Sequence, residues 1–271
     1  MSFKIGDVSK LLGVSVETLR YYEQEGVIRP ERKNYSTTRV YSIWDVYELM
    51  EFKLYRNIGL SINEIKNITQ KGDIDYAGQV LSKRYNEIAS NILYEQRILE
   101  YIRLHQRKLN ALSLNIGNYW FANEPEKRFI VTNEAKSEVY TDFDTKNNTL
   151  LAWIKQYPFV KTYINANPAD VRKGVDHIYW SIAAETGFIK SLSLPTDEQV
   201  RTIPPGLCLH TVVDGGEKGQ INTGLFVPVL EYLERKGFET DGEIRGELVI
   251  RVYENECWHR YIELMIPVKN S

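Results

Sequence analysis

Cysteine and histidine are scarce in this sequence. The 271 residues include 2 Cys and 4 His. Cys208 and Cys257 form no CxxC pair and no Cys/His spacing of the kind that zinc sites use. His177, His210 and His259 lack metal-ligand spacing as well. We therefore expect neither a metal site nor a cofactor.

Long hydrophobic runs are also missing. No stretch reaches the ~18 to 20 uncharged apolar residues that a membrane span needs. The first residues, MSFKIGDVSK, lack the basic start and apolar core of a signal peptide. The composition, with 43% hydrophobic, 26% charged and 12% aromatic residues, is typical of a globular protein. We expect a cytoplasmic protein of more than one domain, because 271 residues exceed one small module.

A strong overall charge is absent, but the charge is unevenly distributed. The formal net charge is −2. Residues 1–75 carry 11 basic and 11 acidic side chains, residues 76–115 carry 6 and 3, and residues 116–271 carry 17 and 22. A uniformly basic nucleic-acid binder is thus excluded, and any DNA contact must be local. The last region, with a net charge of −5, should prefer neutral or cationic partners.

Four short helices are predicted within the first 70 residues. Two apolar faces, which end at Gly13 and Gly26, indicate a helix, a tight turn and a second helix. Capping-box spacings mark the starts of the next two helices, at Ser42/Asp45 and Ser61/Glu64. The polar, basic stretch between the helix pairs, residues 29–41, suits an exposed hairpin or wing.

A heptad pattern runs through nearly 40 residues after Asp75. Apolar residues recur at steps of four and three along one face: Leu81, Tyr85, Ile88, Ile92, Leu99, Ile102 and Leu109. We expect residues 75–116 to form a coiled-coil helix that makes the protein a homodimer. The alternative is a single helix packed across a globular core.

After the junction at Gly117 to Pro125 the periodicity changes to that of strands. Strands are predicted at 128–134, 136–141, 159–165 and 176–183, with a helix near 146–157. A second set follows, with a strand at 206–213, a helix ending near Lys236, and strands near 246–253 and 259–267. Pro228 either begins that helix or kinks it.

The predicted fold is therefore multidomain, α followed by α+β. It has a winged helix-turn-helix domain in residues 1–74 and a long dimerising helix in 75–116. A duplicated β-α-β-β domain would occupy residues 117–271.

The first region contains a series of specific motifs: Ile5-Gly6, Leu12-Gly13-Val14-Ser15, Thr18-Leu19-Arg20-Tyr21-Tyr22-Glu23, Gly26-Val27-Ile28-Arg29-Pro30, Arg39-Val40-Tyr41, Asp45 and Ile58-Gly59-Leu60-Ser61-Ile62-Asn63-Glu64-Ile65. Together these motifs resemble those of the MerR family of transcription regulators. This resemblance covers roughly residues 3–70 in order and without gaps. Residues 125–268 resemble the GyrI-like effector-binding domain of the multidrug-sensing, BmrR-like branch, in strand order and in the segment Gly246-Glu247…Ile266-Pro267-Val268.

The second helix would face the major groove with its first turn, formed by Val16, Glu17 and Thr18. Glu17 can accept a hydrogen bond from cytosine N4, and Val16 or Thr18 can touch a thymine methyl group. We expect these residues to set the choice of sequence. For Glu17 the alternative is a solvated carboxylate that favours the helix macrodipole.

Other residues are expected to hold the DNA backbone. Arg20 and Tyr21 resemble the family's phosphate clamps, and Arg39 and Tyr41 of the wing would grip the flanking phosphates. The wing reads Thr37-Thr38-Arg39 where the family usually has Gly-Tyr-Arg, so it departs from the family at its tip.

A pocket for a lipophilic cation needs aromatic faces and a buried carboxylate. The position of Glu247 resembles that of the ligand-facing glutamate of GyrI-like domains. Candidate walls are Trp153, Tyr163, Tyr179, Trp180, Tyr253 and Trp258. The alternatives are that these aromatic residues belong to the core and that Arg251 neutralises Glu247 at the surface.

The resemblance implies a regulator with defined partners. It implies a homodimer on an over-long promoter spacer, with an effector that distorts the DNA so that RNA polymerase engages both promoter elements. Two alternatives stay open: a DNA binder without a working pocket, and a hydrolase in which Glu247 and Tyr253 or Tyr261 activate water. We expect no enzyme, because motifs such as GxSxG and HExxH are absent.

Overall fold

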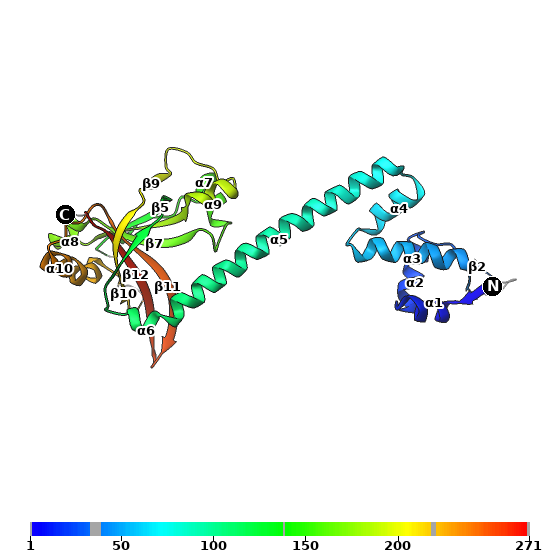
Figure 1. Ribbon diagram of the computed structural model, residues 1–271, viewed down its shortest axis with the longest axis horizontal. Coiled ribbons are helices and arrows are strands. Elements are labelled where there is room, and N and C mark those ends of the chain that lie inside the picture. Colours follow the sequence, from blue (N-terminus) through cyan, green and yellow to red (C-terminus); the bar gives the residue numbers. More distant parts are fainter. Residues whose placement is uncertain (1, 33–38, 138, 218–220, 270–271) are drawn as a thin grey trace. The chain divides into compact units, whose positions relative to one another are not determined.

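The computed structural model describes residues 2–32, 39–137, 139–217 and 221–269 (Figure 1). The chain separates into two compact units, Met1–Gln96 and Arg97–Ser271. The boundary falls within the long helix α5 (Ile74–Asn110). Within the described residues, no helix is long and apolar enough to cross a membrane.

The N-terminal unit combines short helices with a small sheet of strand order β1-β3-β2. Before α5 its elements are β1 (Ser2–Lys4), α1 (Ile5–Leu12), α2 (Val16–Gln24), β2 (Glu31–Arg32), β3 (Arg39–Ser42), α3 (Ile43–Asn57) and α4 (Ile62–Gln70). The four predicted helices are thus all present. The core beneath α1, α2 and α3 contains Val8, Leu12, Leu19, Ile28, Tyr41, Val46 and Leu49, and α4 packs through Ile65 against Phe52 and Leu60.

The helix starts and ends follow the predicted signals. Both capping boxes are formed, at Ser42/Asp45 and at Ser61/Glu64. Gly13 ends α1 with φ 63°, a left-handed conformation that costs glycine no Cβ clash. The tight turn between α1 and α2 therefore follows from the sequence.

The predicted long helix is observed as α5, followed by the short helix α6 (Leu112–Asn115). Figure 1 shows α5 as one continuous helix. No residue of α5 is buried in the single chain. Most apolar residues of the heptad face are exposed, with Tyr85 73%, Ile92 53% and Leu99 66% exposed, and Leu109 is half-buried.

The C-terminal unit is built on one large, largely antiparallel sheet. Its strands are β4 (Trp120–Glu124), β5 (Lys127–Lys136), β6 (Val139–Tyr140), β7 (Lys161–Ala166), β8 (His177–Glu185), β9 (Arg201–Ile203), β10 (Gly206–Asp214), β11 (Ile244–Glu254) and β12 (Cys257–Pro267). Its helices are α7 (Asn148–Ile154), α8 (Pro168–Arg172), α9 (Thr186–Ser191), the 3₁₀ helix η1 (Thr223–Phe226) and α10 (Val227–Lys236). The strand order is β4-β10-β12-β11-β7-β8-β5-β6, with β9 beside β5.

Most predicted elements of this unit have an observed counterpart. The predicted strand at 136–141 is the exception in length, since the described residues of that range hold the end of β5 and the two-residue β6. Pro228 lies in the first turn of α10, so it begins this helix and does not kink it. The sheet-rich α+β architecture of the unit is therefore as predicted.

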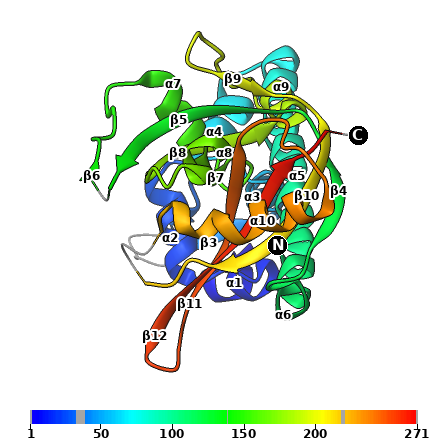
Figure 2. The same ribbon diagram turned by 90° about the vertical axis from the view of Figure 1, so that its left-hand side faces the viewer.

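The pairing register divides the sheet into two faces. Ile164 pairs with Trp180 and with Gly246, so these residues share one face. Helix α10 covers this face, because its Leu230 and Leu233 belong to the same core cluster as Ile164. Figure 2 shows α10 lying across the strands β10 and β12.

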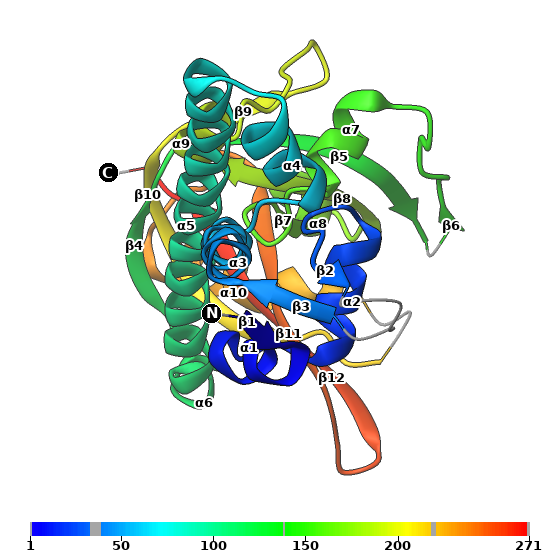
Figure 3. The same cartoon turned by 90° about the vertical axis from the view of Figure 1, so that its right-hand side faces the viewer.

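The opposite face carries the polar residues of interest. Glu247 pairs with Tyr163 of β7 and with Glu263 of β12. The neighbouring Gly246 is required by close packing on the helix-covered face, since a Cβ there would lie 2.6 Å from Ile262 Cγ2. This packing fixes β11 and with it the position of Glu247. Figures 2 and 3 show the far end of the β11–β12 hairpin extending beyond the neighbouring strands.

Candidate functional site

The first turn of α2 carries the three residues predicted to face DNA bases. Ser15 caps the helix, because its hydroxyl accepts a hydrogen bond from the Thr18 amide at 3.0 Å. Glu17 is exposed, and Val16 and Thr18 are half-buried. Hydrogen bonds from its own amide and from Ser15 lower the pKa of Glu17. The carboxylate is therefore charged at neutral pH.

An exposed strip continues along α2 from Glu17. Arg20 and Tyr21 follow at steps of three and four, and both are exposed. The opposite side of the helix is fixed in the core, since Leu19 is fully buried and the Tyr22 ring packs 4.7 Å from that of Phe52. This arrangement leaves Arg20 and Tyr21 free to meet a partner from outside the unit.

The wing arginine is tied to α2 by an ion pair. Arg39 Nε donates to Glu23 Oε2, and Arg32 Nη2 lies 3.3 Å from Glu23 Oε1. Burial alone would raise the pKa of Glu23, but Arg39 and Arg32 lower it. The predicted tip at Thr37-Thr38 lies outside the described residues.

The prediction that Tyr41 grips a phosphate is wrong for this structure. Its side chain is fully buried in the core of the N-terminal unit. Its hydroxyl is buried without a hydrogen-bond partner among the described residues, and burial raises the pKa of Tyr41. The strand alternation turns this residue inward.

A second cluster of interest surrounds Glu247, which is only 6% exposed. Lys161 Nζ lies 2.7 Å from its Oε1, and Lys108 Nζ lies 3.0 Å from its Oε2. The Tyr163 hydroxyl donates to Oε2 at 3.4 Å. Lys108 also lies 2.7 Å from Glu263 Oε2. Glu247 and Tyr163, each predicted to belong to an effector pocket, are thus in contact.

Opposing effects set the charges in this cluster. Burial would raise the pKa of Glu247, but the ammonium groups of Lys108 and Lys161 lower it below its ordinary value. Burial disfavours the charged form of Lys108, yet Glu247 and Glu263 raise its pKa. For Glu263, burial is outweighed by His210 and Lys108, which lower the pKa to about 2. All three groups are therefore charged at neutral pH.

A cavity of about 470 Å³ opens beside Glu247. Its volume is in the range of small-molecule sites. Apolar and aromatic side chains make up much of its wall, among them Tyr101, Leu104, Pro125, Phe159, Tyr163, Phe188 and Met265. Lys127 also lines it, with Nζ 5.6 Å from the centroid of the Tyr163 ring.

The predicted tryptophan walls lie elsewhere. Trp153 is fully buried in a separate core cluster, where its Nε1 donates to the Pro195 carbonyl at 2.9 Å. Trp180 is on the helix-covered face. Neither lines the Glu247 cavity, because strand pleating puts Trp180 on the other side of the sheet.

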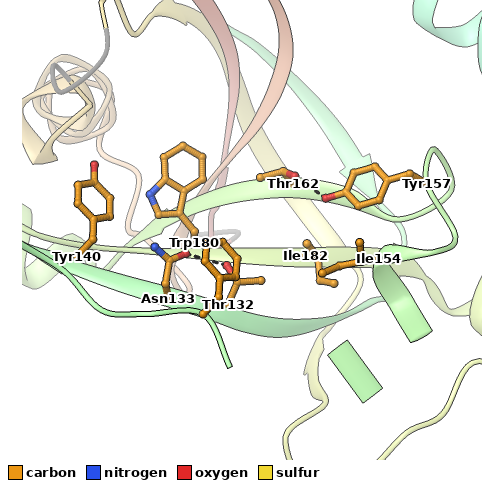
Figure 4. Close-up of a pocket in the computed structure, with 9 residues that line it drawn as sticks. Thr132, Asn133, Tyr140, Ile154, Tyr157, Thr162, Trp180 and Ile182 are labelled. Atoms are coloured by element: carbon orange, nitrogen blue, oxygen red, sulfur yellow. Dashed lines mark hydrogen bonds between the residues drawn. The ribbon is translucent and has the colours of Figure 1, made fainter. Parts of the chain in front are cut away.

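Trp180 lines a different hollow, shown in Figure 4. This second cavity of about 330 Å³ also has Asn133, Tyr140 and Tyr157 in its wall. The Tyr157 and Thr162 hydroxyls are hydrogen-bonded at 2.6 Å. The two cavities are on opposite faces of the sheet.

The other predicted wall residues also need correction. Tyr179 shares the face of Glu247, but its hydroxyl donates to Glu243 and it does not line the cavity. Tyr253 and Trp258 pair at the far end of the β11–β12 hairpin. Arg251 lies over the Trp258 ring at 4.5 Å, so it does not neutralise Glu247.

Sequence reasoning missed the residues that neutralise Glu247. Lys108 precedes it by 139 positions and Lys161 by 86. No local pattern connects such distant residues. The pairing of β7 with β11 brings Lys161 close to Glu247, and Lys108 reaches the same carboxylate from helix α5. Among the described residues, no group of three or more His, Cys, Asp or Glu side chains is placed to hold a metal ion.

Comparison with known proteins gives the class of the chain. Residues 3–72 match the family described as MerR HTH family regulatory protein. The HTH-type transcriptional regulator ZntR homolog of Haemophilus influenzae is 35% identical over 94 residues, which are 33% of this chain and 70% of that protein. This chain belongs to the MerR family of helix-turn-helix regulators.

Two longer likenesses extend beyond the N-terminal unit. The HTH-type transcriptional activator TipA of Streptomyces coelicolor is 25% identical over 144 residues, 53% of this chain and 50% of TipA. The chain therefore spans only half the length of TipA. A solved structure of EcmrR bound to DNA covers 99% of this chain and 100% of its own, at 16% identity and a TM-score of 0.39.

Proposed function

We propose that this protein is a DNA-binding transcription regulator whose C-terminal unit senses a small molecule. The observation that carries the proposal is the exposed strip of Glu17, Arg20 and Tyr21 on α2, in a unit that belongs to the MerR family. A capped helix with an exposed first turn suits the major groove. Arg20, Tyr21 and Arg39 would hold phosphates, and the first turn would read bases. Such a regulator acts on promoter DNA in the cytoplasm.

The apolar face of α5 supports a homodimer. Tyr85, Ile92 and Leu99 repeat at heptad spacing and are exposed in the single chain. The α5 helix of a second chain would cover them. This pairing would place two DNA-binding units on a pseudo-palindromic site. The functional domains in this proposal are 1–74, 75–116 and 117–271.

The effector would occupy the Glu247 cavity. Its aromatic wall and buried carboxylate suit a lipophilic small molecule that is aromatic, cationic or both. The sheet order β10-β12-β11-β7-β8-β5 reads as two mirrored β-α-β-β halves, which supports a duplicated, GyrI-like domain. As an activator, the protein would distort an over-long promoter spacer for RNA polymerase when the effector binds.

The charge state of Glu247 favours a sensor over a hydrolase. Two lysines hold the pKa of this carboxylate low despite its burial, so it is a weak general base at neutral pH. Tyr253, one of the tyrosines considered for catalysis, is 59% exposed at the far end of the hairpin.

Selection of bound duplexes from a random pool tests the DNA-binding part of the proposal. The wild-type chain should enrich a two-fold related sequence. Glu17→Ala should enrich the same half-site spacing but a different base at the position facing Glu17. A pool with no enriched sequence would contradict the proposal.

Calorimetry with a matched ligand pair tests the sensor part. Biphenylcarboxamidine is a cation, and biphenylcarboxamide is its neutral analogue of the same shape. The full chain should prefer the cation, and Glu247→Gln should narrow that preference. Equal affinities for both ligands would indicate a site for neutral molecules, and no saturable binding would indicate a chain without a working pocket.

A further inference from the structure

The carboxylate of the Glu247 cavity already has cations of its own. Lys108 Nζ lies 3.0 Å from Glu247 Oε2 and 2.7 Å from Glu263 Oε2. Lys161 Nζ lies 2.7 Å from Glu247 Oε1. An incoming cation therefore gains an ion pair with Glu247 only by displacing a lysine.

The two lysines differ in what they connect. Lys161 is on β7, two residues before Tyr163, which pairs with Glu247 in the sheet, and its ammonium group forms an ion pair with one carboxylate. Lys108 is on α5 and bridges two carboxylates of the sheet. Displacement of Lys108 thus yields two ion pairs to a ligand, and it breaks a link between α5 and the sheet.

Exposure makes the two lysines, and not the carboxylates, the replaceable members of this cluster. The side chains of Lys108 and Lys161 are 33% and 36% exposed at the cavity wall, whereas those of Glu247 and Glu263 are 8% and 13% exposed. Of the two lysines, Lys108 is the one that bridges both carboxylates. A displaced lysine ammonium on its flexible stem can regain water. The buried carboxylates cannot, so they require a replacement cation.

We propose that Lys108 is an internal competitor for the effector, and that the effector is an aromatic cation with N–H groups which takes its place. The inference rests on the proposed sensor function. Amidinium, guanidinium and primary ammonium groups can donate to both Glu247 and Glu263, as Lys108 does. A quaternary ammonium has no N–H to donate, and its methyl groups keep the charge farther from the oxygens. The aromatic body would lie against Tyr101, Phe159 and Phe188.

Release of Lys108 would also be the signal. The residue is on the last turns of α5, and the same helix continues into the N-terminal unit. When the ligand replaces Lys108, residues 101–110 lose an attachment to the sheet. Binding is thereby coupled to the helix that leads to the DNA-binding unit.

Calorimetry on the full chain tests the competition. Biphenylcarboxamidine should bind at least about tenfold more tightly than biphenyltrimethylammonium. Lys108→Met removes the competitor and should raise the amidine affinity by about tenfold. Lys108→Arg, which keeps a cation and both carboxylates paired, should lower it. Equal affinities for the two cations, or an amidine affinity unchanged in both Lys108 variants, would overturn the inference.

Amide hydrogen exchange tests the signal. Saturating amidine should speed exchange in residues 101–110 of the wild-type chain, and Lys108→Met should show faster exchange without ligand. Lys161→Met is the matched control, because it removes the other lysine and should leave exchange in this helix unchanged. Amidine binding without faster exchange overturns the inference but leaves the sensor standing. No cation binding by the wild type or any variant overturns the sensor itself.

Discussion

The Nε of Arg39, the first residue of β3, donates a hydrogen bond to the Glu23 carboxylate of α2. The same helix carries Arg20 and Tyr21. In the proposed DNA complex the pair of Arg39 and Glu23 would have two effects. It positions the arginine beside α2, and it places a carboxylate near any phosphate that the arginine meets.

Glu23→Gln should strengthen binding to non-specific duplexes severalfold. The substitution removes a negative charge from the face proposed to meet DNA and frees Arg39 to contact a phosphate. The plot of log affinity against log salt concentration should therefore become steeper by about 1. Fluorescence anisotropy over a salt series measures both quantities. Glu25→Gln makes the same charge change two residues farther on and should have a smaller effect. If Glu23→Gln weakened non-specific binding, positioning of Arg39 would outweigh the freed charge.

Tyr41→Phe should leave DNA affinity unchanged. The hydroxyl is buried without a partner among the described residues, so its removal takes away an unsatisfied polar group. Stability should rise or stay within about 1 kcal/mol of the wild type. Chemical denaturation gives the free energy of unfolding, and duplex titration gives the affinity. A loss of DNA affinity in a stable variant would return Tyr41 to the DNA interface.

The C-terminal unit should lose stability in acid through Glu263. The pKa of this group falls from 4.5 to about 2 on folding. A lowered pKa contributes stability that is present above the unfolded value and is lost as pH falls through the folded value. The loss should therefore occur between about pH 5 and pH 2. Calorimetric melting across this range should show a shallower pH dependence in Glu263→Gln, and an unchanged dependence would contradict the assignment.

Ile92→Asp should weaken the dimer. Ile92 lies on the exposed heptad face of α5, where a paired helix would bury the new carboxylate. Asn91→Asp introduces the same side chain one position away, off the heptad face, and serves as the control. Sedimentation velocity at micromolar concentration should show Ile92→Asp shifted toward monomer and Asn91→Asp still dimeric. A monomeric wild type would exclude the proposed homodimer.

Local signals made much of the fold predictable. Ser42/Asp45 and Ser61/Glu64 start helices because capping depends on neighbours in the sequence. The heptad spacing from Leu81 to Leu109 predicted α5, because this spacing too relates residues that are close in the sequence. The predicted strands of the C-terminal unit match observed strands to within a few residues, apart from the short β6, but β4 and β9 were not predicted.

The site depended on relationships that the sequence does not display. Tyr163 and Glu247 share a face only because β7 pairs with β11 in this register. Alternation within β8 could not tell whether Tyr179 or Trp180 shares the face of Glu247. The link from Lys108 to Glu263 joins a helix to a strand more than 150 positions away. No periodic pattern encodes such a pairing.

The central claim is that α2 binds DNA through Arg20. The most direct test compares wild-type and Arg20→Ala chains on specific and random duplexes over a salt series. We expect Arg20→Ala to weaken binding to both duplexes about equally. The plot of log affinity against log salt concentration should become shallower by about 1, which corresponds to the loss of one phosphate contact. An unchanged affinity and an unchanged salt slope would show that this face of α2 does not meet the DNA.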